Sequence, residues 1–262
     1  MDQPQPTSEP APVSPPSSMS LVGRLANVFA APGEVFDDLK AAPVRTANWL
    51  VPTILFMLVS WLSAWLIFSQ ESIRQQLTQI SDKAIDRQVE KGKLTSEQAE
   101  KARETAEKFG TVGYKVAAAA SPVFLGFALP FWWGLILWLG GAKVFKGSIS
   151  YMKAVELTGL GNMILVLDAV VRTLLILLTG NLFATPSAAL AIKDFDPQNP
   201  AHSLVAMVNV MIFWVLLVRS IGLSRLSGAS LGKAIAWVFG IWAGYTSALV
   251  GLGAALRAAF GG

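Results

Sequence analysis

The fold class follows first from the stretch TANWLVPTILFMLVSWLSAWLIFSQ at residues 46–70, which contains no Asp, Glu, Lys or Arg. About 20 apolar residues in a helix are enough to cross the ~30 Å hydrocarbon core of a bilayer. Windows that also lack these four residue types recur at residues 116–142, 197–218 and 234–256. Because lipid offers no hydrogen bonds to the backbone, each window predicts a membrane-spanning helix.

The charges of the chain are few and unevenly distributed. Of the 262 residues, 53% are hydrophobic and 15% are charged, against about 25% charged in a soluble domain. Residues 70–115 alone hold 9 Lys/Arg and 8 Asp/Glu out of totals of 21 and 17. This distribution excludes an ordinary soluble protein, a disordered chain and a nucleic-acid binder. It predicts a protein whose main partner is the lipid bilayer.

The residue types that carry most enzyme and metal chemistry are scarce. The chain has no Cys and one His, His202, so the sequence offers no disulfide framework, zinc site or thiol nucleophile. We find no motif typical of a catalytic, cofactor-binding or metal-binding site, and we expect a protein that is not an enzyme and needs no cofactor.

A fifth span is predicted at residues 155–179, where two ionisable residues oppose insertion. Thirteen Leu, Ile and Val between residues 157 and 179 favour insertion by about 4–8 kcal/mol. Asp168 and Arg172 oppose it by about 5–7 kcal/mol together. The two contributions nearly cancel, so the apolar character of this helix does not show whether it spans the membrane. The charges of the loops provide the second criterion.

The loop charges favour five spans with a cytoplasmic N-terminus and a C-terminus on the other side. In that topology each cytoplasmic segment carries three Lys/Arg, as the positive-inside rule requires. These residues are Arg24, Lys40 and Arg45, then Lys143, Lys146 and Lys153, then Arg219, Arg225 and Lys233. We predict an all-α, polytopic membrane bundle with spans at about residues 47–69, 116–139, 155–179, 203–222 and 232–256.

The N-terminal 45 residues divide into two parts before the membrane domain of residues 46–262. Residues 1–18 are rich in Pro and Ser and predict a disordered tail. Residues 19–45 predict two short amphipathic helices, because Leu21, Leu25, Val28 and Phe29 share one helical face. We expect this pair at the membrane interface with its apolar side towards lipid; the alternative is a small helix packed on loops.

Residues 70–115 predict an extracytoplasmic helical hairpin between the first two spans. Thr95 and Gln98 have the spacing of a capping box, and Gly92 is the expected turn. Glu97 and Lys101 are four residues apart, which supports a second helix. The hairpin is either a docking element for a protein partner or a solvated, charged cap.

Asp168 and Arg172 are the polar pair predicted inside the membrane. Their spacing of four residues places them on one helical face, where they can neutralise each other. The functional interpretation is an ion relay or a polar substrate pocket. The alternative is a structural ion pair that fixes helix packing. We expect no second carboxylate at this depth.

A stripe of small residues marks the last predicted span. Ala236, Gly240, Gly244 and Ala248 recur at every fourth position, and such stripes allow two helix backbones to approach closely. The stripe predicts close packing, either against another helix of the same chain or against a second copy.

Several short motifs resemble the Yip1 family of five-span membrane proteins, in its bacterial branch. Pro32, Glu34, Phe36 and Leu39 match the family's P-x-E-x-F-x-x-L entry motif. Further similar elements occur in the same order along the chain: Trp49 and Pro52, then Gly147 to Tyr151, then Trp214, Gly222 and Leu223, then Ser227 to Lys233.

The resemblance implies an all-helical, five-span fold with a cytoplasmic N-terminus. Eukaryotic members bind Rab-type GTPases and act in vesicle traffic or membrane shaping. This chain lacks their Asp-Leu-Tyr-Gly-Pro signature, and its residues 70–115 form a longer loop than theirs, so GTPase binding is not expected. For a bacterial protein we expect the inner membrane, and for a eukaryotic one the ER or Golgi membrane.

Two functions are expected from these observations. The first is a non-enzymatic scaffold that organises a membrane or extracytoplasmic protein partner, or the bilayer itself, and that self-associates. The alternative is a transporter or channel for a small solute or ion that uses Asp168 and Arg172.

Overall fold

The computed structural model describes residues 19–192, 195–196 and 199–261; the predicted tail of residues 1–18 lies outside this part. Within it the chain is helical, and the only β-type pairing is an isolated bridge between Ser187 and Asn209. Five helical stretches are long and apolar enough to cross a membrane, which confirms the predicted fold class. They are Ala47–Phe68, Val112–Val144, Tyr151–Thr179, Val210–Ser227 and Leu231–Gly253.

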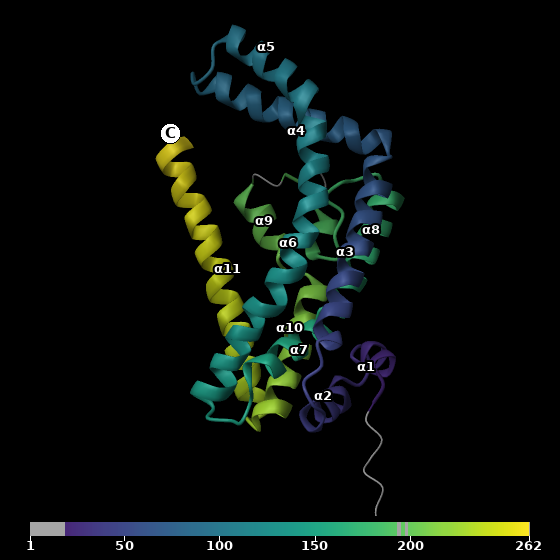
Figure 1. The fold of residues 1–262 in the computed structure, drawn as a ribbon. Coiled ribbons are helices and arrows are strands. Elements are labelled where there is room, and N and C mark those ends of the chain that lie inside the picture. Colours follow the sequence, from purple (N-terminus) through teal and green to yellow (C-terminus); the bar gives the residue numbers. More distant parts are fainter. Residues whose placement is uncertain (1–18, 193–194, 197–198, 262) are drawn as a thin grey trace, which may run out of the picture.

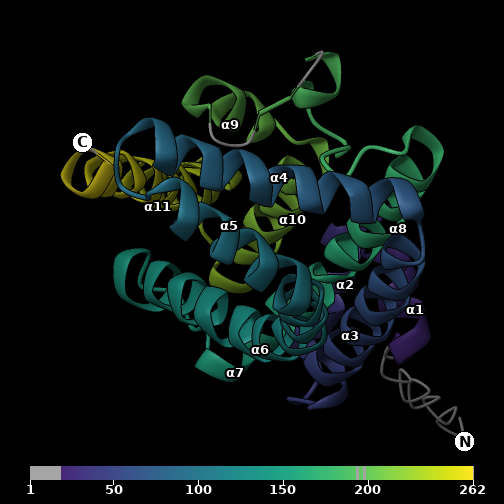
Figure 2. The same cartoon turned by 90° about the horizontal axis from the view of Figure 1, so that it is seen from above.

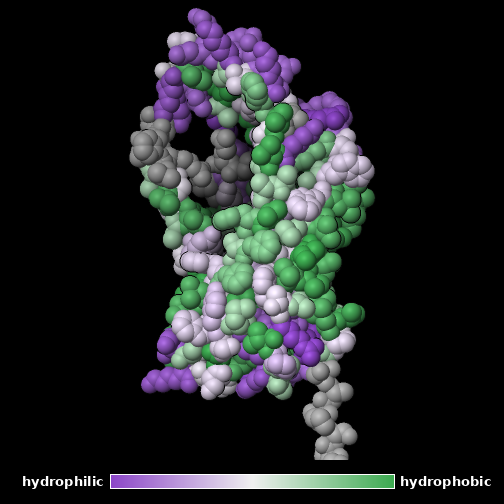
Figure 3. All heavy atoms as spheres, in the orientation of Figure 1, coloured by the Kyte–Doolittle hydropathy of each residue, from purple (hydrophilic) through white to green (hydrophobic). Residues whose placement is uncertain are grey.

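The elements follow one another up and down along a single bundle axis (Figures 1 and 2). The short helices α1 (Leu21–Asn27) and α2 (Pro32–Ala41) lie at one end, which we call the α1–α2 end. The opposite end, called the hairpin end, carries α4 (Glu71–Glu90) and α5 (Ser96–Thr105). Figure 3 shows a hydrophobic band between hydrophilic surfaces at the two ends, as expected for a protein that spans a bilayer.

The first two spans are α3 (Ala47–Phe68) and α6 (Thr111–Trp138), and α6 continues as a π-helical segment, η2 (Leu139–Val144). Helix α6 contains Pro122 and Pro130 and runs through both residues without interruption. Pro130 cannot donate to the carbonyl of Gly126 four residues earlier. The hydroxyl of Thr53 on α3 donates to that carbonyl instead, at 3.1 Å, so a neighbouring helix supplies the missing hydrogen bond.

The third span begins earlier than predicted and is divided. It consists of α7 (Tyr151–Gly161) and α8 (Met163–Thr179). Asn162 separates them, with a backbone conformation of φ −69° and ψ −9°. The span predicted at about residues 155–179 is therefore present, with its start at Tyr151 and its end at Thr179. Ser150 caps α7 by accepting a hydrogen bond from the Lys153 N–H, which sets the earlier start.

The fourth span is α10 (Val210–Ser227), whereas we predicted residues 203–222. Its start is set by Asn209, whose side chain accepts hydrogen bonds from the backbone N–H groups of Met211 and Ile212. Its end is set by Gly228, which adopts the left-handed conformation at φ 77°. The residues before Asn209 form the separate helix α9 (Pro200–Ala206), and residues 188–191 form the 3-10 turn η3 (Ala188–Ala191).

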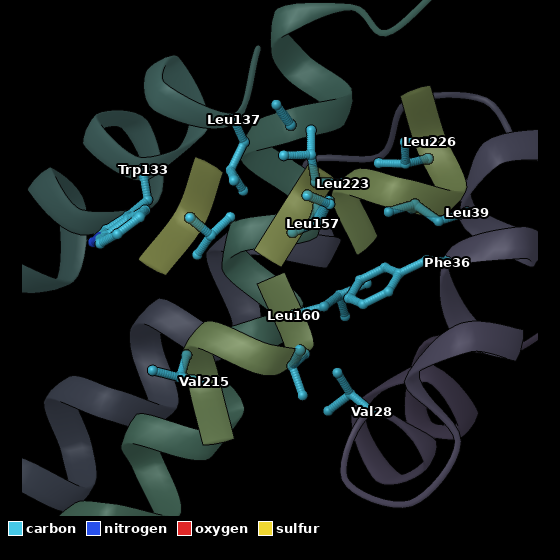
Figure 4. Packing of buried hydrophobic residues seen from close by; sticks show 14 of the residues in the cluster. Val28, Phe36, Leu39, Trp133, Leu137, Leu157, Leu160, Val215, Leu223 and Leu226 are labelled. Atoms are coloured by element: carbon cyan, nitrogen blue, oxygen red, sulfur yellow. The ribbon is translucent and has the colours of Figure 1, made fainter. Parts of the chain in front are cut away.

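The main hydrophobic core lies towards the α1–α2 end. Phe36 and Leu39 of α2 are fully buried and lie beside Leu157, Leu160 and Leu223 (Figure 4). Helix α2 packs chiefly on α10, with further contacts to α7. The apolar side of α2 is therefore covered by membrane-spanning helices, and neither the predicted lipid contact of this side nor the alternative of packing on loops describes it.

The last span, α11 (Leu231–Gly261), is the least embedded in the bundle. It packs along α10, and the Trp237 indole also donates to the Ile136 carbonyl of α6 at 3.1 Å. Beyond that point α11 diverges from α6 towards the hairpin end (Figure 1).

Candidate functional site

A cavity of about 690 Å³ lies between the spans and carries the ionisable residues of the membrane interior. Side chains of α3, α6, α8, α10 and α11 line it, and most of them are apolar. Its polar lining residues are Ser60, Ser63, Ser121, Asp168, Arg172, Thr173, Arg219 and Tyr245. A largely apolar cavity with a few convergent polar groups is the typical form of a small-ligand site.

The predicted polar pair belongs to this cavity. Arg172 Nη2 donates to Asp168 Oδ2 at 3.0 Å, one helical turn apart on α8. The Asp168 side chain is 9% exposed and that of Arg172 is 44% exposed. The second carboxylate oxygen, Oδ1 of Asp168, has no hydrogen-bond partner among the described residues. The ion pair is thus formed, but Asp168 Oδ1 can still accept a hydrogen bond and the other N–H groups of Arg172 can still donate one to a group in the cavity.

Arg219 is a third charged residue of the cavity, which the sequence analysis missed. We had counted it among the cytoplasmic loop cations, but it lies in the middle of α10 and is 3% exposed. Its Nη2 donates to Asn162 Oδ1 at 2.8 Å, and its guanidinium lies 4.4 Å from the centre of the Trp133 ring. Two signals could have placed it correctly: the N-cap Asn209 and the C-terminal Gly228.

A second polar network lies at the α1–α2 end, around Glu156. The Oε1 atom of this fully buried residue accepts from Asn48 Nδ2 at 2.7 Å and from the Arg45 N–H at 2.6 Å. Its Oε2 atom lies 3.0 Å from Lys153 Nζ. Glu156 is thus a second buried carboxylate of the bundle, but it lies at the α1–α2 end with Arg45, Asn48 and Lys153 and does not line the cavity of Asp168.

The same network continues to the N-terminal helices. Arg24, 1% exposed, bonds to Asn48 Oδ1 at 3.2 Å and forms an ion pair with Asp38 at 2.7 Å. Lys153 also donates to the carbonyls of Leu39 and Ala42, each at 2.7 Å. These bonds connect α1 and α2 to α3 and α7, so the network stabilises the packing of the N-terminal helices on the spans.

The residues of the entry motif have distinct structural roles in α2. Pro32 occupies the first turn of the helix and Glu34 supplies a negative charge there, which suits a helix N-terminus. Phe36 and Leu39 are the buried anchors of the core. Gly222 of α10 lies so close to Phe36 and Leu157 that a Cβ atom would be 2.6 Å from a Leu157 methyl carbon. The motif therefore specifies how α2 docks on α10.

The small-residue stripe has no partner within the described chain. Ala236, Gly240, Gly244 and Ala248 are all exposed on α11. A Cβ atom built on Gly240 or Gly244 would meet no heavy atom within 4 Å. The close packing predicted for this stripe is not provided by another helix of the same chain, so self-association stays a prediction.

The hairpin is formed as expected, with the turn at Gly92 in the left-handed conformation. The Thr95 hydroxyl and the Gln98 side chain make both bonds of the capping box. The π-helical segment η1 (Ala106–Gly110) joins α5 to α6. The Glu97–Lys101 ion pair is present at 3.0 Å.

Charged residues of the hairpin interact mostly at its surface. Arg74 lowers the pKa of Glu71 by hydrogen bonding and by its charge, and Asp86 raises the pKa of Arg103 mainly by hydrogen bonding. At its base the hairpin is fixed to the body, because Gln76 bonds to Gly180 and Leu182 and Arg87 pairs with Asp196 at 3.1 Å.

Comparisons with known proteins give one match. The family model described as Yip1 domain matches residues 26–253. No curated protein and no solved structure matches the chain. The matched region runs from the end of α1 into α11 and includes the entry motif, the residues that line the cavity and the polar network around Glu156 except Arg24. With five helices able to span a membrane and a family match over most of its length, the chain belongs to the Yip1 domain family of membrane proteins.

Proposed function

We propose that this membrane protein is a non-enzymatic scaffold that holds a protein partner at its hairpin end. The observation that carries this proposal is the hairpin itself, a charged two-helix element anchored to the body at Gln76 and Arg87. Its outer surface is hydrophilic (Figure 3), and its Glu97–Lys101 pair is largely exposed. A rigid base with an exposed polar surface suits recognition of a partner outside the bilayer.

The proposal is tested by crosslinking and mass spectrometry on native membranes. Lys83, Lys101 and Lys108 are exposed on the hairpin, and we expect one protein to crosslink to them in a fixed ratio. A variant lacking residues 72–113 should lose this partner while its spans still unfold cooperatively. A folded deletion variant that captures the same protein would contradict the proposal.

We further propose that the α1–α2 end is cytoplasmic, that the C-terminus lies outside, and that the membrane is a bacterial inner membrane. The positive-inside distribution of Lys/Arg supports this orientation. Because the chain has no Cys, single cysteines report it directly. A membrane-impermeant maleimide should label Lys101→Cys but not Glu34→Cys in intact cells. The reverse labelling would show the opposite orientation.

A second candidate function is passage of a small solute or ion along Asp168 and Arg172. It is favoured by one observation, that both side chains line the cavity inside the spans. On this proposal Asp168→Asn abolishes flux in reconstituted vesicles without lowering the amount of folded protein. Equal losses of flux and of folded protein would instead indicate a structural ion pair.

A further inference from the structure

Arg219 is a buried cation without a nearby countercharge. No carboxylate of the described residues lies within ion-pair distance of it. Its contacts are an amide oxygen of Asn162 and the face of Trp133, and its Nε has no hydrogen-bond partner. A charge at this depth in a membrane protein is costly unless it is compensated. A bound anion beside Arg219 would supply the missing compensation.

The charge balance of the cavity points in the same direction. Its ionisable lining residues that carry charge at neutral pH are Asp168, Arg172 and Arg219. Asp168 is paired with Arg172, so one positive charge remains. A single negative charge would make the cavity neutral. Guanidinium groups favour phosphate and carboxylate oxygens, to which they donate in parallel.

The walls of the cavity indicate that this anion is part of a lipid. Most of the lining is apolar, including Phe56, Leu125 and Leu129, and a free ion would lose its hydration there without replacement. The cavity extends along α6 from Ala118 to Trp133, about 22 Å of helix. The lining also includes Trp242 and Tyr245 of α11, a helix that is largely exposed, so acyl chains that follow these residues reach the bilayer.

We propose that the cavity binds one lipid whose headgroup is a singly charged phosphate diester. The phosphate lies between Arg219 and Arg172, and the chains lie against the apolar walls. This inference is independent of the scaffold proposal, since it concerns the interior of the spans and requires neither a protein partner nor flux.

The test uses the full chain, stripped of lipid and incubated with vesicles of equal parts phosphatidylcholine and phosphatidylglycerol. Native mass spectrometry should show one phosphatidylglycerol retained per chain. Arg219→Gln removes the uncompensated charge and should weaken retention about tenfold or more, as expected for loss of a charge-assisted hydrogen bond. Asp168→Asn removes the negative charge of the cavity, which raises its net charge by one, and should strengthen retention of the anionic lipid. Opposite effects of these two variants cannot result from a general loss of folding.

Matched variants separate the cavity from the outer surface. Arg225→Gln removes an arginine of α10 that is paired with Asp37 outside the cavity, and it should retain the lipid. Ala169→Trp fills the cavity and should exclude the lipid, whereas Val170→Trp, at the adjacent exposed position, should not.

Two results would overturn the proposal. Equal retention of phosphatidylcholine and phosphatidylglycerol, unchanged by Arg219→Gln and Asp168→Asn, would show only lipids bound around the spans. Binding of inorganic phosphate alone, with displacement of phosphatidylglycerol, would show a site for a soluble anion.

Discussion

The two ends of the bundle are packed in different ways. At the α1–α2 end, residues of α2, α6, α7, α8, α10 and α11 enclose one large core, and Phe36, Leu157 and Leu223 are fully buried. At the hairpin end, the buried core is a small cluster of Ile73, Ile176 and Ala184. The cavity lies between the two, and its lining runs from Trp133 of the large core to Leu182 beside the small cluster.

The buried charges of the two regions differ in their ion pairs. Glu156 pairs with Lys153 and Arg24 pairs with Asp38, whereas Arg219 of the cavity forms no ion pair with any described carboxylate. Buried atoms without a hydrogen-bond partner occur in both regions, on Arg24, Trp49 and Glu156 and on Asp168 and Arg219. A buried charge beside its countercharge stabilises the fold, and one without a countercharge has capacity for a charged ligand. This difference assigns structure to the α1–α2 end and binding to the cavity, and four predictions test it.

The largest loss of stability is expected for Glu156→Ala. Removal of this carboxylate leaves the Asn48 amide and the Arg45 N–H without their acceptor and Lys153 without its countercharge, at a cost of about 3–5 kcal/mol. The measurement is the free energy of unfolding in detergent. Glu97→Ala, which breaks an exposed pair on the hairpin, is the control and should cost less than about 0.5 kcal/mol. Similar losses of unfolding free energy in the two variants would contradict the structural role assigned to the α1–α2 end.

The next effect is expected for Gly159→Ala on α7. A Cβ atom at this position would overlap the backbone of Trp49 on α3 and lie 2.9 Å from the Asn48 carbonyl oxygen. We expect a loss of about 1–3 kcal/mol. Gly240→Ala, where a Cβ meets nothing, should be neutral or stabilise by up to about 1 kcal/mol. Thermal unfolding of the two variants, side by side, measures the difference in packing between α7 and α11.

A smaller and local effect is expected for Thr95→Ala. It removes the hydroxyl of the capping box, which costs about 1 kcal/mol and should raise hydrogen exchange in α5 without changing that of α7. Thr105→Ala is the control, because that hydroxyl bonds only within the helix, to the Lys101 carbonyl. Faster exchange throughout the spans would show that the hairpin is part of the bundle's cooperative unit.

The smallest effect on folding is expected for Gly244→Leu. Among the described residues, no heavy atom outside the backbone of α11 lies within 4 Å of a Cβ built here, so stability should not change, but a second copy packed on the stripe would be displaced. We expect a crosslinked dimer of the wild-type chain to be lost in Gly244→Leu and kept in Thr246→Leu, which lies on another face of the helix. A dimer that persists in both variants would place the self-association surface elsewhere.

Much of the fold could be predicted from the sequence because lipid imposes strict requirements on it. Helices α3 and α11 begin within one residue of their predicted starts, since long apolar windows have no other stable form in a bilayer. The capping box at Thr95 was also predictable, because its bonds are local. The ends of α7 and α10 were less accurate, because the caps Ser150 and Asn209 were not recognised.

The candidate site could be predicted only in part. Asp168 and Arg172 are four residues apart on one helix, so their pairing follows from helix geometry alone. Arg219 is distant in sequence and resembles a loop cation when charges are counted. Its neighbours Asn162 and Trp133 come from two other spans, and no local pattern indicates that these helices meet.

By itself, the sequence determined that this chain is a five-helix membrane protein with a charged helical hairpin and a family entry motif, because hydropathy and capping act over short distances. The tertiary contacts were needed to show that α2 is buried against α10, that Glu156 meets Asn48 and Lys153 in the interior, and that Arg219 and Asp168 share a cavity. The physical reason is that burial and compensation of charge depend on which helices pack together, and those contacts join residues far apart in the chain.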